Sequence, residues 1–371
     1  MKAGWEVKAL GEVATFVMGQ APAGSDCNKD GIGTPFVKAG EFGESRPVIR
    51  EWTTDPKKFA KDSDVLICVV GATCGKINLG ANCAIGRSAA AIRPVPNALD
   101  QFYLHYYLEG QVQTFRAGSL GAAQTVISRE MLSEMALPLP PLNEQKRIVE
   151  VLDAAFEGLT RARAHTETNL QNARELFESF TREVIANCEI QYEAQSLAAI
   201  ADNLDRRRVP ITKGDRVAGD IPYYGASGIV DYVAGHLFDE ELLLISEDGA
   251  NLLARSTPIA FAITGKTWVN NHAHILRFSD RNVQQFVSLY LNSISLAPFV
   301  SGMAQPKLNQ QEMNRIPIPL PNPAVCAEIV SKAEALVAET SNLQSHYRAK
   351  LADLDALRQS LLQKAFAGEL T

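Results

Sequence analysis

The sequence predicts an α+β protein in which one unit occurs twice, each copy being a mixed α/β globule followed by a long helix. Two stretches carry apolar or small residues at alternating steps of four and three, and each residue of the second stretch lies 181 positions after its counterpart, as Ile329 lies after Ile148. A repeat of 3.5 residues is typical of a coiled-coil seam. A proline-rich segment precedes each stretch, Leu137–Pro141 in the first copy and Ile316–Pro321 in the second. We therefore expect globules at 1–142 and 191–322, and helices at 143–190 and 323–371, related by a pseudo-two-fold repeat.

The first globule has a clear central strand. Val65–Val70 is a continuous apolar run that ends at Gly71, the pattern of a buried strand. Cys83–Gly86 and Ala89–Ile92 indicate a second strand region, and Phe102–Leu108 predicts an aromatic-faced helix that ends at Gly110.

The second globule repeats this order with little identity. Leu242–Ile245 leads to Gly249, as Val65–Ile67 leads to Gly71 in the first copy. Val283–Leu291 corresponds to the aromatic helix, and Gly302–Gln305 corresponds to Gly121–Gln124. Two diverged copies of one unit account for the pattern.

Each long helix has a start signal. Asn143 can cap the first helix and Asn322 the second, where Pro323 suits the first helical position. At about 44 residues and ~1.5 Å rise per residue, each helix would be roughly 65 Å long. Their seams are modest, with Ala, Thr and Leu, so neither helix would be stable alone. We therefore expect the two helices to pack against each other as an antiparallel coiled coil.

Two polar residues, Asn169 and Lys350, fall at equivalent positions of this predicted seam. Either they are tolerated beside solvent, or they fix the register of the helix pair. The second alternative predicts that Asn169→Leu raises stability while loosening the register.

Composition excludes several classes of protein. No run of 18 apolar residues is present, and the first residues lack the apolar core of a signal peptide, so we expect a cytoplasmic protein. The six cysteines include no CxxC pair, which indicates free thiols and neither disulfides nor a zinc site. The net charge of −6 does not exclude nucleic-acid binding, because a local basic face decides that property.

At this point the chain resembles the specificity subunit of type I restriction-modification enzymes. The resemblance covers almost the whole sequence and rests on the order of many short segments: Trp5 with Leu10–Ala14, Thr34–Val37, Asp64–Ile67 with Gly71 and Gly75-Lys76, Cys83–Arg87, Leu139–Gln145, Ile221–Gly228, Val269–His274, Gln305–Asn309 and Gln363–Leu370. Each segment is weak alone, whereas the order, the duplication and the junction at Leu139–Gln145 together are specific.

The resemblance implies two target recognition domains, each of which reads one half of a split DNA sequence. The two long helices, the conserved regions of such subunits, would set the number of unread base pairs between the halves. They would also dock two methyltransferase (modification) subunits, with restriction/translocase subunits joining that core. Adenine is the methylated base that the resemblance implies. The second junction departs from the pattern, because Asn322-Pro323-Ala324 replaces Asn143-Glu144-Gln145, which puts equal partner contacts by the two helices in doubt.

Such a subunit is not an enzyme and needs no cofactor of its own; S-adenosylmethionine, ATP and Mg²⁺ would bind partner subunits. No Asn-Pro-Pro-Tyr or Asp-Pro-Pro-Tyr motif is present. Ala260–Thr267 approaches a phosphate-binding loop but lacks the first glycine and leads into a strand-like segment. His272 and His274 would share one face of a strand, and they either form structural hydrogen bonds with Asn270 and Asn271 or contact DNA, since no further metal ligand is evident.

The candidate DNA contacts follow from chemistry, because Arg and Lys suit guanine or phosphate while Asn and Gln suit adenine. Arg206-Arg207-Arg208 is a tight basic run that is either a solvated loop or a DNA contact, and Lys213 and Arg216 extend it. The further candidates lie at strand ends and in glycine-rich loops: Gln20, Lys76, Arg87, Gln124, His272, Gln305 and Lys307.

Three alternatives remain open from the sequence. The chain could belong to a methylation-only system without a restriction partner. It could be a coiled-coil scaffold whose globules bind proteins, which retention on DNA together with a methyltransferase partner would discriminate. It could also be a nucleotide-dependent enzyme at Gly265-Lys266-Thr267, which saturable ATP binding would reveal.

Overall fold

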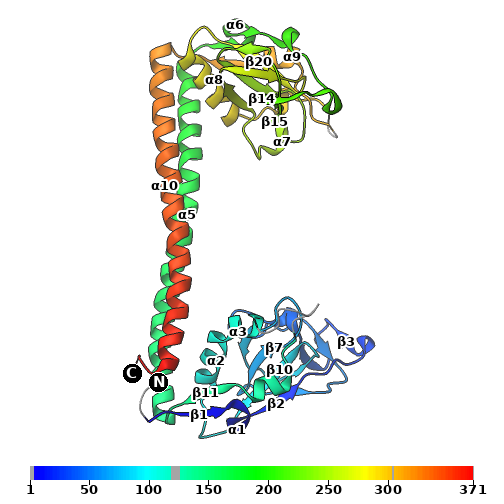
Figure 1. The fold of residues 1–371 in the computed structure, drawn as a ribbon, viewed down its shortest axis with the longest axis vertical. Coiled ribbons are helices and arrows are strands. Elements are labelled where there is room, and N and C mark those ends of the chain that lie inside the picture. The colour runs from blue at the N-terminus through cyan, green and yellow to red at the C-terminus, as the bar shows by residue number, and fades with distance from the viewer. Residues whose placement is uncertain (1–3, 118–125, 303–304, 371) are drawn as a thin grey trace. The chain divides into compact units, whose positions relative to one another are not determined.

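A computed structural model of the chain describes residues 4–117, 126–302 and 305–370 (Figure 1). The chain divides into two compact units, residues 1–166 with 349–371 and residues 167–348, which we call the first and second unit. Each is a mixed α/β unit with two principal sheets and one small two-stranded sheet.

The main sheet of the first unit is antiparallel in the order β2-β10-β7-β8. Its strands are β2 (Ala14–Met18), β10 (Ala89–Pro94), β7 (Val65–Cys68) and β8 (Ile77–Leu79). The other sheet has the order β3-β5-β4-β9-β6, with β3 (Cys27–Asn28), β5 (Trp52–Thr53), β4 (Thr34–Val37), β9 (Cys83–Ile85) and β6 (Phe59–Ala60). A two-stranded sheet pairs β1 (Glu6–Ala9) with β11 (Ala136–Leu139).

Strand β7 confirms the buried strand that the apolar run predicts. Successive side chains of a strand point to opposite faces of its sheet. Val65 and Ile67 enter the core beneath helix α2 (Gln101–Gly110), whereas Leu66 and Cys68 enter a second core shared with the other sheet. Both faces are covered, so the run is continuous rather than alternating.

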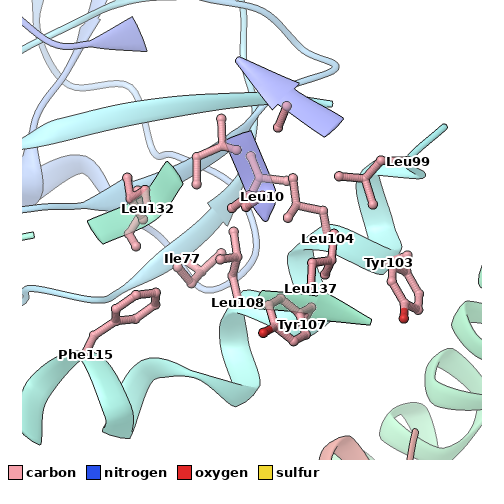
Figure 2. Close-up of a cluster of buried hydrophobic side chains, with 14 of the residues drawn as sticks. Leu10, Ile77, Leu99, Tyr103, Leu104, Tyr107, Leu108, Phe115, Leu132 and Leu137 are labelled. Carbon is pink, nitrogen blue, oxygen red and sulfur yellow. The ribbon is translucent and has the colours of Figure 1, made fainter. Parts of the chain in front are cut away.

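Helix α2 closes one face of the main sheet. Asp100 caps it by accepting hydrogen bonds from the backbone N–H groups of Phe102 (2.9 Å) and Tyr103 (3.1 Å). Figure 2 shows Leu104 and Leu108 of this helix directed at the same cluster as Leu10, Ile77 and Leu137.

The second unit repeats this plan, except that β3 has no counterpart among the residues that the structure describes. Its main sheet has the order β13-β20-β17-β18, with β13 (Asp202–Asn203), β20 (Ala273–Arg277), β17 (Leu242–Ser246) and β18 (Ala260–Ile263). Its other sheet has the order β15-β14-β19-β16, with β15 (Gly228–Val233), β14 (Ala218–Gly225), β19 (Lys266–Val269) and β16 (Phe238–Asp239). The small sheet pairs β12 (Ala194–Ser196) with β21 (Pro317–Pro319).

Matching details establish that the two units are copies. Helix α8 (Arg281–Ser293) is capped by Asp280 in the same way that α2 is capped by Asp100. Each second sheet contains one parallel pair, β4 with β9 and β14 with β19. Two short helices of each unit also correspond in order, α1 (Leu10–Val13) and α4 (Arg129–Ser133) with α6 (Leu197–Ile200) and α9 (Gln310–Asn314). The other two differ, because α3 (Val112–Ala117) follows α2 whereas α7 (Asn251–Ala254) precedes α8.

The long helices are α5 (Leu142–Gln191) and α10 (Pro323–Ala367). The predicted cap Asn322 is confirmed, because its Oδ1 accepts a hydrogen bond from the Val325 amide (3.1 Å). The predicted cap Asn143 is wrong, since α5 already begins at Leu142 and its first turn is closed by Pro141, whose carbonyl accepts from the amides of Glu144 (2.8 Å) and Gln145 (3.1 Å).

Within each unit the two long helices run antiparallel. In the first unit, Ile148 and Leu152 of α5 share a core with Leu362 and Ala365 of α10, and Arg163 pairs with Asp355. In the second unit, residues earlier in α10 meet residues later in α5, as Cys326 and Val330 share a core with Ile185 and Cys188.

The predicted seam is correct at Thr166, Ala173 and Thr340, which are buried, but wrong at Asn169 and Lys350, which are exposed. An α-helix has 3.6 residues per turn and drifts about 20° per heptad from a 3.5-residue pattern. The predicted pattern therefore moves onto the exposed face, where Leu176 and Leu357 also lie. The hypothesis that Asn169 and Lys350 fix the register is wrong, because neither lies in the seam.

Candidate nucleic-acid interface

In the first unit, two predicted DNA contacts lie on adjacent backbone segments. The amide of Gln20 donates to the carbonyl of Ile85 (3.0 Å), and the amide of Gly19 donates to that of Ala89 (3.0 Å). A Cβ atom at Gly19 would lie 2.1 Å from the carbonyl oxygen of Gly86, so only glycine allows this approach. Gln20 is therefore held against the turn that carries Arg87, and both side chains are exposed.

The remaining first-unit candidates differ in environment. Lys76 is half-buried and donates from Nζ to the carbonyl of Phe42 (2.8 Å), so it has an internal partner. Gln124 lies outside the described residues. Arg87 makes no side-chain hydrogen bond or ion pair with any residue that the structure describes.

In the second unit, the three consecutive arginines have three different environments. They lie in and directly after the 3₁₀ turn η3 (Asp205–Arg207). Arg206 is exposed and unpaired within the described ranges. The guanidinium of Arg207 lies 4.6 Å from the ring centroid of Phe238 and 3.4 Å from Glu240 Oε1. Arg208 is held on all sides and is only 15% exposed.

Arg208 belongs to a buried ionic network that the sequence does not reveal. Its Nη1 donates to Glu247 Oε2 (2.5 Å) and to the carbonyl of Ala273 (2.9 Å), and its Nη2 lies 3.5 Å from Asp205 Oδ2. Lys307 reaches the other oxygen of the same carboxylate, Glu247 Oε1, at 3.2 Å. Glu247 thus joins two of the predicted cations, Arg208 and Lys307.

His274 completes this network through both of its ring nitrogens. Its Nδ1 lies 2.6 Å from Asp205 Oδ2, and its Nε2 lies 2.8 Å from the carbonyl oxygen of Leu308. Both neighbours are hydrogen-bond acceptors, an arrangement that suits an imidazolium, in which both ring nitrogens donate. The side chain is 2% exposed, so both contacts lie away from water.

The carboxylates respond to these cations. Burial alone raises the pKa of Asp205, but the hydrogen bond and charge of His274, the Ile275 amide and Arg208 outweigh it and lower the pKa below its ordinary value. The pKa of Glu247 is also lowered. Burial raises this pKa, but the contacts with Arg208, His274 and Lys307 lower it by more. Both groups therefore stay ionised inside the unit.

The prediction for His272 needs a correction. Its backbone amide donates a hydrogen bond to Asn270 Oδ1 (2.8 Å), as the structural alternative predicts, but its ring pairs with Asp248, whose Oδ2 lies 2.8 Å from Nδ1. The two histidines point to different acidic partners rather than to one shared face. Among the described residues, no group of three or more His, Cys, Asp or Glu side chains is arranged to hold a metal ion.

The other second-unit candidates divide in the same way. Arg216 Nη1 donates to Asp231 Oδ2 (2.9 Å), and its guanidinium lies 4.5 Å from the ring centroid of Tyr223, so the side chain has internal partners. Lys213, in the 3₁₀ turn η4 (Lys213–Asp215), and Gln305 are exposed. The segment Ala260–Thr267 forms parts of β18 and β19, so a strand rather than a helix follows Lys266.

Comparison with known proteins finds a protein family whose model matches this chain. Residues 2–169 and 191–351 each match the model of the type I restriction modification DNA specificity domain. The chain belongs to this family. Its two matched segments fall on the two repeated units, as expected if each unit carries one specificity domain.

Relatives in the family include proteins from three organisms. A putative type I restriction enzyme specificity subunit of Haemophilus influenzae is 36% identical over 163 residues, 44% of this chain and 41% of the relative. A putative specificity subunit of Methanocaldococcus jannaschii is 37% identical over 154 residues, 40% of this chain and 36% of the relative. The chain thus spans well under half the length of these two relatives. The EcoBI specificity subunit of Escherichia coli is 21% identical over 99% of this chain and 86% of that protein.

Solved structures show the same fold. A chain from a type I R-M system superposes with a TM-score of 0.76 at 17% identity, covering 100% of this chain and 99% of that one. The HsdS subunit of Thermoanaerobacter tengcongensis gives 0.67 at 18% identity, with 100% and 98% coverage.

The described cysteines are all free. Within the described ranges, no helix combines the length and apolar character needed to cross a bilayer.

Proposed function

We propose that this chain is the sequence-specific DNA-binding subunit of a type I restriction-modification system and that it recognises a bipartite DNA target. The observation that supports this most directly is the duplicated specificity-domain match, which falls on two structural copies of one unit. Two copies of a reading unit on one chain suit a target with two separated halves.

The contacts of the candidate side chains suggest how they divide the work. Arg208 and Arg216 have internal acidic partners and little exposure, and Lys76 has an internal carbonyl partner, so we assign these three to structure. Gln20, Arg87, Arg206, Lys213, Gln305 and Lys307 present exposed groups that can reach base edges or phosphates. His272 is half exposed, and its pairing with Asp248 makes it a weaker candidate.

The chemistry of modification and restriction would belong to partner subunits. In this proposal the chain is non-catalytic and binds no cofactor itself, while modification subunits, two in number, carry S-adenosylmethionine and methylate adenine. Restriction/translocase subunits would supply the ATP- and Mg²⁺-dependent steps. The proposal rests on family membership.

A methylome tests the proposal. The chain is co-expressed with its neighbouring methyltransferase subunit in a methylation-free host, and modified bases are mapped by single-molecule sequencing. We expect one split motif with a fixed gap. Absence of new methylation, with both proteins soluble and associated, would contradict the proposal and favour a scaffold.

The salt dependence of DNA binding tests the division of residues. Each phosphate contact contributes about −0.9 to the slope of log K against log salt concentration. We expect Arg206→Ala to make the slope less steep by up to about that amount, whereas Arg216→Ala, matched in charge, leaves the slope unchanged. Equal slopes for Arg206→Ala and the unaltered chain would remove Arg206 from the phosphate contacts.

A further inference from the structure

We propose that Glu247 and His274 are positioning residues that hold two DNA-facing segments of the second unit at a fixed separation. The segments are the 205–208 turn, which presents Arg206, and the 305–308 segment, which presents Gln305 and Lys307. This inference rests on the proposed function, and it assigns the sequence specificity of the second unit partly to groups that do not touch DNA.

Two ionic links connect the same two segments. In the first, Asp205 accepts from His274 Nδ1 (2.6 Å), and His274 Nε2 donates to the carbonyl of Leu308 (2.8 Å). In the second, Glu247 accepts from Arg208 Nη1 (2.5 Å) and pairs with Lys307 Nζ (3.2 Å). Each link begins in the 205–208 turn and ends in the 305–308 segment, so the two segments cannot move apart without breaking both.

The middle members of the links are fixed by backbone pairing. His274 lies in β20 opposite Ile245 of the neighbouring strand β17. The amide of Leu308 donates to the carbonyl of Glu247 (2.8 Å), and the amide of Ile275 donates to Asp205 Oδ1 (2.8 Å). A sheet therefore anchors the two side chains that tie the segments together.

Low exposure makes the links stiff. The side chains of His274, Asp205 and Glu247 are 2%, 5% and 12% exposed. Where water is excluded, charged hydrogen bonds are stronger, and leaving one of them unmade is costly. Arg206 and Lys307 are exposed but project from rigid segments. A side chain that reads the edge of a nucleobase needs such a fixed position.

Sequence specificity and overall DNA affinity depend differently on the rigidity of these segments. Phosphate contacts tolerate small displacements, whereas bidentate contacts to base edges depend on geometry. Glu247 also carries a negative charge close to Lys307, which we assign to the DNA-facing side, so its carboxylate opposes DNA binding. Removing that charge should weaken discrimination between sequences while leaving non-specific binding equal or tighter. Loss of folding would lower both.

The experiment uses Glu247→Gln in the full chain, assembled with its modification partner. The substitution keeps the side-chain shape and removes the charge. Methylation rates are measured on the mapped motif and on DNAs with one base changed in either half. We expect discrimination to fall on the order of tenfold in one half and to stay unchanged in the other, while binding to non-specific DNA holds or rises.

Asn292→Ser is the matched control. Asn292 on α8 accepts from the amides of Ile259 (2.8 Å) and Ala260 (3.1 Å), so its loss destabilises the second unit without touching either segment. We expect it to lower the melting temperature and keep discrimination in both halves. Should Glu247→Gln misfold, Glu247→Asp serves in its place, because it keeps the charge but shortens the side chain that reaches Arg208 and Lys307, and discrimination should again fall in one half only.

The outcomes separate the two proposals. A wild-type complex that methylates no split motif contradicts the proposed function. A split motif whose discrimination is the same in wild type and Glu247→Gln leaves the function standing and overturns the positioning role. An equal loss in Glu247→Gln and Asn292→Ser also overturns it, because stability alone would then explain the effect.

Discussion

At one pair of equivalent backbone positions, the first unit has apolar side chains and the second unit has charged ones. In the first unit, Met18 of β2 lies opposite Ala90 of β10, and both contribute to an apolar core. In the second unit the matching pair is Asp205, two residues after the end of β13, and His274 of β20, joined by an ionic hydrogen bond. The fold therefore tolerates either an apolar pair or a charged pair at this point.

The difference extends along the neighbouring segment. Val69 donates its amide to Ser88 and accepts from Ile127, while Glu247 makes the same two backbone bonds with His272 and Leu308. The next residues pair as Val70 with Val126 in the first unit and as Asp248 with Lys307 in the second. The backbone bonds that define the unit are common to both copies, so the side chains at this edge were free to diverge.

The largest effect is expected when the histidine of the charged pair is placed in the apolar pair of the first unit. Ala90→His would bury an imidazole opposite Met18, where no carboxylate can compensate it. We expect the first unit to lose about 4 kcal/mol, since overpacking and an unsatisfied polar group both contribute. Chemical denaturation of the full chain, with hydrogen exchange to assign the unit, measures the loss. A change below 1 kcal/mol would contradict the comparison.

The reverse change should cost somewhat less. His274→Ala leaves Asp205 buried without its closest cation, and we expect the second unit to lose about 3 kcal/mol. The double variant Asp205→Met with His274→Ala reproduces the first-unit pair, and it should recover at least half of that loss. Additive effects in the double-mutant cycle would show that the two residues do not act as a pair.

Much of the architecture followed from the sequence because its signals are local. Continuous apolar runs gave β7 and β17, the aromatic runs gave α2 and α8, and a repeated seam gave the long helices. The seam failed at Asn169 because a 3.5-residue pattern, extended over many turns, departs from the real 3.6-residue helix.

The ionic network did not follow, because its members are far apart in the chain. Asp205 and His274 are separated by 69 positions, and nothing in either segment indicates the other as its partner. Arg206, Arg207 and Arg208 looked equivalent, yet folding gives each a different environment. A register-based alignment of the two copies was the available signal, since it places Glu247 and His274 where the other copy has Val69 and Ala90.

Acid should weaken the second unit selectively. The pKa values of Asp205 and Glu247 are lowered in the fold. Their contribution to stability is therefore complete above the unfolded values, about 3.9 and 4.3, and is lost as the pH falls through the lower folded values. Hydrogen exchange at pH 5 and pH 3 should show faster opening of β20 than of β10 at the lower pH. Asp205→Asn should reduce that difference, and equal opening of both strands at pH 3 would count against this account.

The smallest effect is expected in the helix pair, where the units do not differ. Asn169 is exposed, so Asn169→Leu should change the free energy of unfolding by no more than about 0.5 kcal/mol. Ala173→Asn, a polar residue placed in the buried seam, is the matched control and should destabilise clearly. A stabilisation above 1 kcal/mol by Asn169→Leu would indicate that residue 169 lies in the buried seam.

The core of the first unit also has a consequence for synthesis of the chain. Phe366 packs edge-to-face on Tyr103 and Tyr107, with centroids 5.1 and 5.2 Å apart, and Leu362 and Ala365 are buried beside them. These residues leave the ribosome more than two hundred residues after helix α2, which they cover. The unit that begins first is therefore finished last, and it holds an uncovered apolar face while the second unit is made. A nascent chain of this kind depends on closing a very long loop, which slows folding.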